Sequence, residues 1–247
     1  DCPQFIQSTI GRYCQYQIKN CSWQGEHGWQ KQLLAWEKEV YDILMQESVY
    51  SEGTIAKCCV ESIDDGGELF IGNSMPIRDV DMFTLTSSKI IDTYSNRGAS
   101  GIDGVISSAL GMSHNSVNKN SLLLIGDVSF YHDMNGLLAS RYEANLTIVV
   151  INNSGGGIFS FLPIAESNVE NFQQYWTTDT GLSIEKVAGL YNSKYYLAEN
   201  LQDLEKSIQE SFKQKGVQII EVKTTIRDNI IAHNRLRDKI KAALSDD

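Results

Sequence analysis

The sequence predicts an α/β fold, a doubly wound and mostly parallel sheet with helices on both faces. The main observation is a βαβ unit within 121–162: a short apolar run, a segment of helical character, and a second apolar run at 146–151. Polar residues follow each run, Gly126-Asp127 after the first and Asn152-Asn153 after the second. Helical segments and short apolar runs continue to alternate towards the C-terminus, which is typical of a parallel sheet wound with helices.

Local signals justify the elements in order. The helix expected at 29–46 has an apolar stripe formed by Leu33, Trp36, Val40, Ile43 and Leu44. A second helix is expected at 51–63, where Ser51-Glu52 supplies an acidic start. A buried strand at 67–73 follows the turn 64–67. The remaining expected elements are helix 105–110, a polar connection 110–120, strand 121–126, helix 130–142, strand 146–151, loop 164–182, helix 183–191, strand 194–197, helix 201–214, strand 217–222 and helix 228–244.

Residues 1–29 show no clear periodicity, and Gly25 and Gly28 are expected to break any regular element there. We interpret 1–29 as the tail of an upstream domain or a linker, and 30–247 as one C-terminal domain. The chain begins at Asp1 rather than at methionine, so we expect sequence to be missing at this end.

The composition limits the partners of the protein. The formal charge of −10 and the pI of about 4.9 argue against nucleic acid or an anionic membrane as partners. An anionic substrate must then be held by a few placed arginines. The longest apolar runs are far below the ~20 residues that a membrane span needs, and no signal peptide precedes the chain.

The cysteines favour a reducing compartment. The chain has five of them, an odd number, with neither a CxxC motif nor a Cys/His ligand spacing. A reduced, cytoplasmic protein fits this pattern best.

Asp127 and Asn153 are the main candidate ligands. The carboxyl ends of parallel strands lie on one edge of a sheet, so the two side chains are expected to meet although they are far apart in sequence. A carboxylate, an amide oxygen and the carbonyls of the glycine turn at 155–157 are hard donors that suit Mg²⁺ when phosphate oxygens complete the shell. The pattern indicates a Mg²⁺-diphosphate site. The alternative is structural, with Asp127 as a helix N-cap and 152–157 as an ordinary turn.

The motif resembles a known one. Gly126-Asp127, followed by Asn152-Asn153, is similar to the diphosphate-binding motif of thiamine diphosphate enzymes, which begins Gly-Asp-Gly and ends Asn-Asn. Val128 stands where that motif has its second glycine. The segments GDVSFYHDMNGLL and NNSGGGIFSFLP resemble a narrower family that shares this departure, the 2-succinyl-5-enolpyruvyl-6-hydroxy-3-cyclohexene-1-carboxylate synthases of menaquinone biosynthesis. The resemblance covers most of 66–163 and continues more weakly to the end.

The resemblance implies a binding site for thiamine diphosphate and Mg²⁺ or Mn²⁺. The metal ligands would be Asp127, Asn153 and the backbone carbonyl of Gly155. The residues that would contact the cofactor are Asp127, Val128, Ser129, Asn153, Gly155, Gly156, Ile158 and Phe159.

Two further segments resemble the substrate site of the synthases. Gly-Asn-Ser followed by an arginine, at 72–78, and the segment NRGASGIDG, at 96–104, match the family closely. Glycines 98, 101 and 104 are spaced GxxGxxG, which is not the dinucleotide fingerprint GxGxxG. The alternative for 72–78 is a polar strand end with a solvated arginine. The implied substrate-binding residues are Asn73, Ser74, Arg78, Arg97, Phe159 and Leu162.

The implied activity is that of a larger protein. The synthases decarboxylate 2-oxoglutarate and add the resulting succinyl-semialdehyde unit to isochorismate, as homodimers or homotetramers. Their activating glutamate belongs to an N-terminal pyrimidine-binding domain of a partner subunit, and no stretch here resembles that domain. We therefore expect no catalytic residue in this chain and no activity from the chain alone. The alternatives are an acetolactate-synthase-like or 2-oxoacid decarboxylase domain, and a non-catalytic Mg²⁺-phosphate-binding α/β module.

Overall fold

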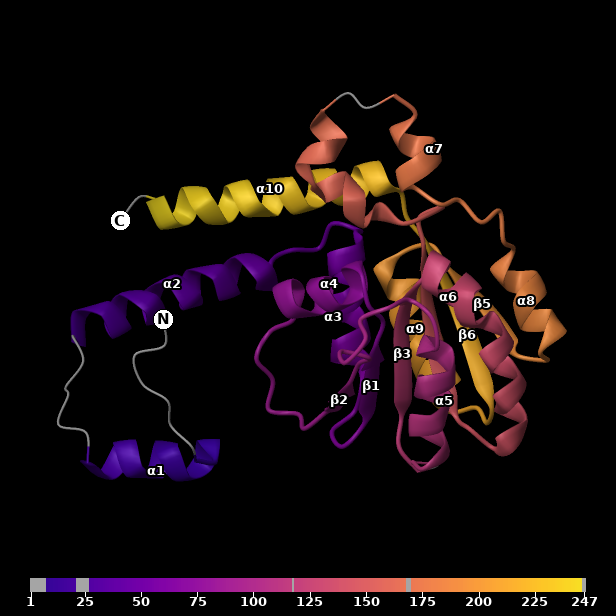
Figure 1. The fold of residues 1–247 in the computed structure, drawn as a ribbon, viewed down its shortest axis with the longest axis horizontal. Coiled ribbons are helices and arrows are strands. Elements are labelled where there is room, and N and C mark those ends of the chain that lie inside the picture. The colour runs from indigo at the N-terminus through magenta and orange to yellow at the C-terminus, as the bar shows by residue number, and fades with distance from the viewer. Residues whose placement is uncertain (1–7, 21–26, 117, 168–169, 246–247) are drawn as a thin grey trace.

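A six-stranded, all-parallel sheet forms the centre of the described residues, which are 8–20, 27–116, 118–167 and 170–245 of a computed structural model (Figure 1). The strand order is β2-β1-β3-β4-β6-β5. The predicted doubly wound α/β fold is confirmed. The strands are β1 Glu68–Ile71, β2 Asp92–Tyr94, β3 Ser121–Gly126, β4 Leu146–Asn152, β5 Lys194–Ala198 and β6 Val217–Lys223.

Helices precede, connect and follow these strands. The α-helices are α1 Ile10–Asn20, α2 His27–Met45, α3 Glu52–Ser62, α4 Met75–Phe83, α5 Val105–His114, α6 Asp127–Asp133, α7 Phe172–Trp176, α8 Ile184–Leu190, α9 Leu201–Ser211 and α10 Ile226–Ser245. Three segments are 3₁₀ helices: η1 Met134–Tyr142, η2 Gly157–Phe161 and η3 Pro163–Glu166. The helix that we expected at 130–142 begins at Asp127 and changes to 3₁₀ geometry at Met134.

Both faces of the sheet are buried. In β3, Leu123 and Ile125 pack against α5, η1 and α8, whereas Leu122 and Leu124 pack against α3 and α9. Successive side chains of a strand point to opposite faces, so a strand covered on both sides must be apolar throughout. This requirement explains the continuous apolar runs in the sequence.

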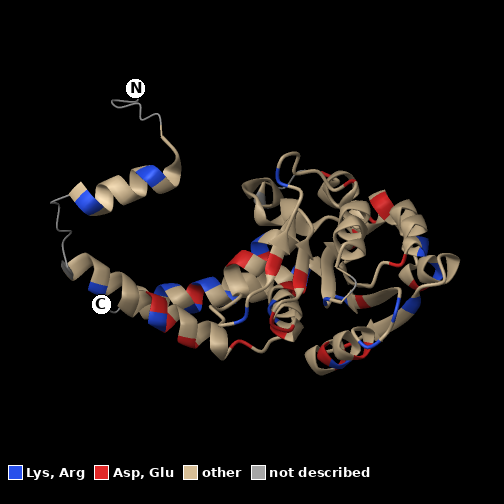
Figure 2. Ribbon diagram, turned by 90° about the horizontal axis from the view of Figure 1, so that it is seen from below, with Lys and Arg blue, Asp and Glu red and all other residues tan. Residues whose placement is uncertain are grey.

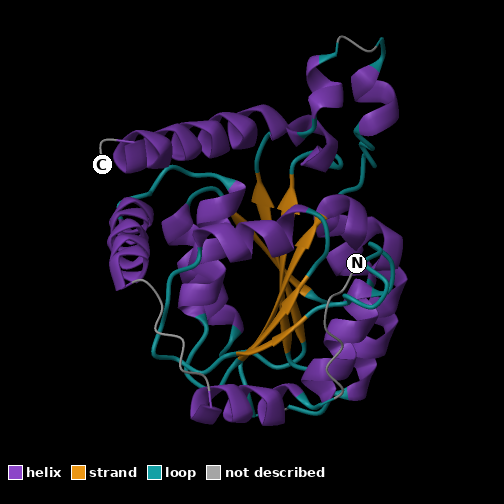
Figure 3. Cartoon of the chain, turned by 60° about the vertical axis from the view of Figure 1, so that its left-hand side comes forward, coloured by secondary structure: helices purple, strands orange, loops and turns teal. Residues whose placement is uncertain are grey.

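The order of the strands creates a crevice at one edge. The chain runs from β1 outward to β2 and then returns to β3 on the other side of β1, so the winding direction reverses between β1 and β3. In open α/β sheets, ligands bind where the winding reverses, beyond the carboxyl ends of the strands. Figure 3 shows the arrowheads of the strands pointing to a single edge, near which α10 and the segment around α7 lie.

Several sequence-based expectations were wrong. Residues 10–20 form α1, and Gly28 lies inside α2 rather than ending it. Helix α4 and strand β2 were not expected, α5 continues to His114, and the expected loop 164–182 contains part of η3 and all of α7. The interpretation of 1–29 falls partly on residues 1–7 and 21–26, which lie outside the described residues, as do Cys2 and Cys21.

The N-terminal helices differ in their packing. Helix α1 has no buried residue and lies apart from the sheet in Figure 1. Helix α2 packs along α10 through an apolar cluster that contains Leu44 and Leu236, with an ion pair between Glu47 and Arg235. Figure 2 shows acidic and basic residues interleaved along these helices. No helix in the described part of the chain is long and apolar enough to cross a membrane.

Helix α10 also reaches the sheet edge through one buried histidine. His233 Nε2 lies 3.0 Å from Asp79 Oδ1 on α4, and both side chains are almost fully buried. The imidazole makes edge contacts with two rings, Phe83 on α4 and Phe161 in η2. Burial raises the pKa of the Asp79 carboxyl, while the contact with His233 opposes that rise. His233 therefore joins the C-terminal helix to both α4 and η2.

The contact between α3 and α4 gives a test of the packing. A Cβ at Gly53 would lie 2.4 Å from ring atoms of Phe83, a side chain that is only 1% exposed. Gly53→Ala should therefore destabilise the protein by roughly 1–3 kcal/mol through overpacking, as measured by urea denaturation. Gly111→Ala is the matched control, because a Cβ at this exposed position of α5 meets nothing within 4 Å. The control should be neutral or stabilising by up to ~1 kcal/mol. Equal stability of the two variants would contradict the packing described here.

Candidate cofactor and metal site

A cavity of about 320 Å³ lies at the carboxyl edge of the sheet. It is lined by the ends of β1, β3 and β4, by the first residue of α3, by η2 and by the segment after α7. Most of the residues predicted from the sequence line it: Asn73, Ser74, Asp127, Val128, Ser129, Asn153, Gly155, Gly156, Ile158 and Phe159. Arg78, Arg97 and Leu162 do not belong to its lining.

Asp127 connects the end of β3 to the glycine turn after β4. Its Oδ2 accepts a hydrogen bond of 2.8 Å from the Gly155 N–H, and its Oδ1 accepts one of 2.8 Å from the Val128 N–H. Gly155 has φ of +137°, and a Cβ there would lie 3.1 Å from the backbone of Thr178. Only glycine combines this backbone conformation with so close an approach. The turn is therefore fixed against the carboxylate.

Asn153 presents an oxygen without a hydrogen-bond partner. Its Oδ1 is buried and accepts no hydrogen bond, while its Nδ2 donates to Glu52 Oε1 at 2.7 Å. A buried polar atom without a partner is costly, and a missing ion is one common explanation. The described residues contain no group of three or more His, Cys, Asp or Glu that could hold a metal. One carboxylate, one amide oxygen and backbone carbonyls, with phosphate oxygens from a ligand, therefore fit Mg²⁺ better than a metal that prefers nitrogen or sulfur.

Glu52 is a cavity residue that the sequence analysis missed. We interpreted it as the acidic start of a helix, and it is indeed the first residue of α3 after the N-cap Ser51. Its side chain is only 2% exposed and accepts hydrogen bonds from Asn153 and from the Thr224 hydroxyl. Burial raises the pKa of Glu52 to about 7, although the bond from Asn153 opposes the rise. No sequence motif indicates this role, because both partners are more than 100 positions away.

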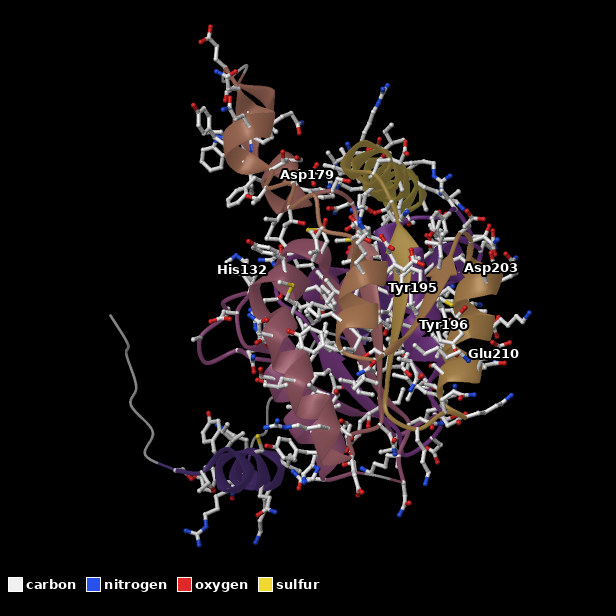
Figure 4. The ribbon with its side chains drawn as sticks, turned by 90° about the vertical axis from the view of Figure 1, so that its right-hand side faces the viewer. His132, Asp179, Tyr195, Tyr196, Asp203 and Glu210 are labelled. Carbon is white, nitrogen blue, oxygen red and sulfur yellow. The ribbon has the colours of Figure 1, made fainter. Side chains whose placement is uncertain are left out.

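The site carries more negative charge than its own donors can stabilise. Burial raises the pKa of Asp127 to about 6, despite the hydrogen bonds from Gly155 and Val128. The charge of Asp179, labelled in Figure 4, raises this pKa further. A bound divalent cation would favour the charged carboxylate and offset the burial.

Asn73 has a structural task at the end of β1. Its Oδ1 accepts a hydrogen bond of 3.0 Å from Arg97 Nη1, and its Nδ2 donates to the carbonyls of Asn96 and Gly101. The side chain is only 2% exposed. Asn73 therefore fixes the 96–104 loop over the crevice and orients Arg97, whose side chain is exposed.

The other predicted substrate residues lie at the margin of the cavity. Ser74 lines it with φ of +72°, a conformation that is uncommon for a residue other than glycine and is often found at functional sites. Arg78 is exposed on α4 and donates to the Ser74 carbonyl at 2.5 Å. Leu162 follows η2 and is 46% exposed.

Aromatic side chains form one wall that the sequence did not indicate. Phe159 in η2 makes an edge contact with Trp176 of α7, with ring centroids 5.1 Å apart. Trp176 and Thr178 line the cavity, within the segment that we expected to be loop. Ile102 also lines it, and its carbonyl accepts a hydrogen bond from Ser129 Oγ at 2.7 Å.

Residues 83–222 match the family described as "Thiamine pyrophosphate enzyme, C-terminal TPP binding domain". This chain belongs to that family. Thiamine pyrophosphate is thiamine diphosphate, so the cavity with Asp127 and Asn153 lies in a thiamine diphosphate-binding domain. The resemblance to thiamine diphosphate enzymes that the motifs predicted is confirmed.

Curated relatives narrow the similarity. The domain is 44% identical over 221 residues to 2-succinyl-5-enolpyruvyl-6-hydroxy-3-cyclohexene-1-carboxylate synthase of Listeria innocua, over 87% of this chain and 38% of that protein. It is 36% identical over 247 residues to the synthase of Bacillus cytotoxicus, over 98% of this chain and 42% of that protein. The chain thus spans about two fifths of the length of these relatives.

Solved structures share the fold of the thiamine diphosphate domain. A putative thiamin diphosphate-dependent enzyme from Mycobacterium smegmatis has a TM-score of 0.57 at 16% identity, over 71% of this chain and 32% of that one. Benzoylformate decarboxylase from Polynucleobacter necessarius has a TM-score of 0.56 at 21% identity, over 70% of this chain and 33% of that one.

The buried carboxyl of Glu52 gives a pH test of the metal-free domain. Its pKa is about 7 in the folded protein and 4.5 as the reference value. The folded state therefore holds the proton more tightly, and stability falls as the pH rises from about 4.5 to about 7. Glu52→Gln removes this ionisation. The variant should gain on the order of 3 kcal/mol relative to wild type between pH 4.5 and pH 8, as measured by denaturation at both pH values. A constant difference between the two proteins would show that Glu52 titrates normally.

Proposed function

We propose that this chain is the diphosphate-binding part of a thiamine diphosphate-dependent synthase that joins 2-oxoglutarate and isochorismate in menaquinone biosynthesis. The main support is the buried, unpartnered Oδ1 of Asn153 in the cavity that Asp127 also lines. The similarity to synthases at 36–45% identity supports the choice of reaction.

Asp127, Asn153 and the Gly155 carbonyl would hold Mg²⁺ or Mn²⁺ against the diphosphate. The Gly155 N–H is already bonded to Asp127, so the turn is ordered before the ligand arrives. The ion would neutralise charge between the acidic site and the anionic diphosphate. When bound, thiamine diphosphate supplies the carbon nucleophile and the electron sink that decarboxylation of a 2-oxoacid needs. Trp176, Phe159 and Ile158 form apolar parts of the cavity wall, which would exclude water from the reacting end.

Arg78 and Arg97 would bind substrate carboxylates. Arginine can bind a carboxylate with two parallel hydrogen bonds, and Asn73 holds Arg97 at the mouth of the crevice. Both proposed substrates are dicarboxylates. The exposed side chains of both arginines would then be covered by substrate, with Phe159 and Leu162 as apolar contacts.

The site would be completed by another subunit. We propose that the activating glutamate comes from the N-terminal pyrimidine-binding domain of a partner, in a homodimer or homotetramer of the longer protein. The chain alone would then be inactive, because it lacks the group that activates the cofactor. A carboligation assay of residues 1–247 with cofactor, metal and both substrates tests this, and turnover that disappears in Asp127→Ala would overturn it.

The alternatives make different predictions. An acetolactate-synthase-like or 2-oxoacid decarboxylase domain would use the same cofactor without isochorismate. A non-catalytic Mg²⁺-phosphate-binding module would take another phosphate ligand. Thiamine diphosphate with Mg²⁺ should raise the melting temperature when ATP and NAD do not, and the choice among thiamine enzymes then depends on the substrates accepted.

Asp127→Ala tests the metal site directly. The variant should lose metal-dependent binding of thiamine diphosphate, because it removes the charged ligand and the acceptor for the Gly155 N–H. Isothermal titration calorimetry with and without Mg²⁺ measures the effect. Asp133→Ala is the control, since Asp133 accepts hydrogen bonds from Ser107 outside the cavity lining. Unchanged cofactor binding by Asp127→Ala would disprove the assignment.

Arg78→Lys and Arg97→Lys test the substrate assignment in the longer polypeptide that carries the partner domain. Each should lower kcat/KM roughly ten- to hundredfold for one substrate, because a charged hydrogen bond contributes about 1.5–3 kcal/mol. Cofactor affinity should stay unchanged. Arg141→Lys, at an exposed position of η1 outside the cavity lining, is the control. A lysine variant with wild-type kcat/KM for both substrates would show that its arginine does not bind them.

A further inference from the structure

We propose that Glu52 is a positioning residue that fixes the side-chain amide of Asn153 with Oδ1 facing the metal position. This inference rests on the proposed function of Asn153 as a metal ligand. It assigns a task to a buried carboxylate that the cofactor motif does not include.

An asparagine amide can present either end to a ligand. Its oxygen and its NH₂ group have nearly the same shape, and hydrogen-bond partners decide which way the group points. A metal ligand needs the oxygen. At Asn153, the Nδ2 donates to Glu52 Oε1 at 2.7 Å, and a carboxylate can only accept. The amide oxygen must therefore point away from Glu52, and it is this Oδ1 that has no partner.

Glu52 is itself held from several directions. The Thr224 hydroxyl lies 3.2 Å from the same Oε1, and the Glu52 N–H donates to Asn229 Oδ1 on α10 at 3.2 Å. Ser51 caps α3 through its bond with the Thr54 N–H. The Glu52 side chain, only 2% exposed, cannot turn away without breaking these contacts. The fold therefore fixes the acceptor before a ligand binds.

The neighbouring asparagine provides an internal comparison. Asn152 Nδ2 donates to the buried carboxylate of Glu221 at 2.7 Å, as Asn153 does to Glu52. However, Asn152 Oδ1 accepts a hydrogen bond from the Ser154 N–H, so its oxygen is used within the turn. Tyr195, labelled in Figure 4, donates to the other oxygen of Glu221. Neither Asn152 nor Glu221 lines the cavity. Two similar carboxylate-amide pairs therefore differ in one respect, a free amide oxygen at the cavity.

The test measures Mn²⁺ affinity by electron paramagnetic resonance, with thiamine diphosphate present throughout. Glu52→Leu removes the acceptor and should weaken Mn²⁺ binding roughly 10–100-fold, the usual effect of losing a partner that orients a metal ligand. Glu52→Gln keeps a carbonyl that can accept from Asn153, so its affinity should stay within about threefold of wild type. Glu221→Leu is the matched control and should also stay near wild type.

Each outcome decides the inference. Wild-type affinity in Glu52→Leu would overturn the positioning role, as would equal weakening in Glu221→Leu. If Glu52→Gln binds as weakly as Glu52→Leu, the charge of Glu52 matters and orientation does not. If Glu52→Leu fails to fold, Glu52→Asp carries the same expectation of weakening, because its carboxylate is one methylene short of Asn153. A wild-type chain that binds no Mn²⁺ would instead overturn the proposed metal site.

Discussion

The hydrogen bond from the Gly155 N–H to the Asp127 carboxylate is the contact on which the cavity depends. It joins the end of β3 to the turn after β4. The parallel register places these strand ends side by side, since Gly126 pairs with Ile151. Because the turn is closed by a carboxylate instead of by water, its glycines stay at the crevice and Asn153 faces the same space. A sheet of the same order without this bond would have two separate loops at its edge.

The sequence predicted those parts of the fold that depend on continuous burial. Strands β3, β4 and β6 are apolar runs because helices cover both of their faces, and their bounds agree with the structure to within a residue. Strand β2 escaped prediction because its three residues are all exposed at the sheet edge. Helix α4 escaped because it follows a serine at positive φ and includes Pro76 near its start, both of which are typical of a turn.

The candidate site divides along a similar line. Asp127 and Asn153 stand in a recognisable motif at strand ends, so topology alone brings them together. Glu52 and Trp176 reach the cavity only through tertiary packing, from α3 and α7, and nothing in their neighbouring residues indicates it. Asn73 shows a third case. Its position was predicted, but the structure shows a side chain whose hydrogen bonds hold the loop that carries Arg97.

The burial of His233 links the far end of the chain to the cavity wall. The imidazole lies against Phe161, which belongs to the same 3₁₀ turn as the cavity residues Ile158 and Phe159. Through Asp79 it also holds α4, which starts at the cavity residue Met75. A shortened chain that ends before His233 would keep Ile158, Phe159 and Met75 and still lose the support behind them. The length of the C-terminal helix is thus part of the architecture of a pocket more than 70 positions upstream.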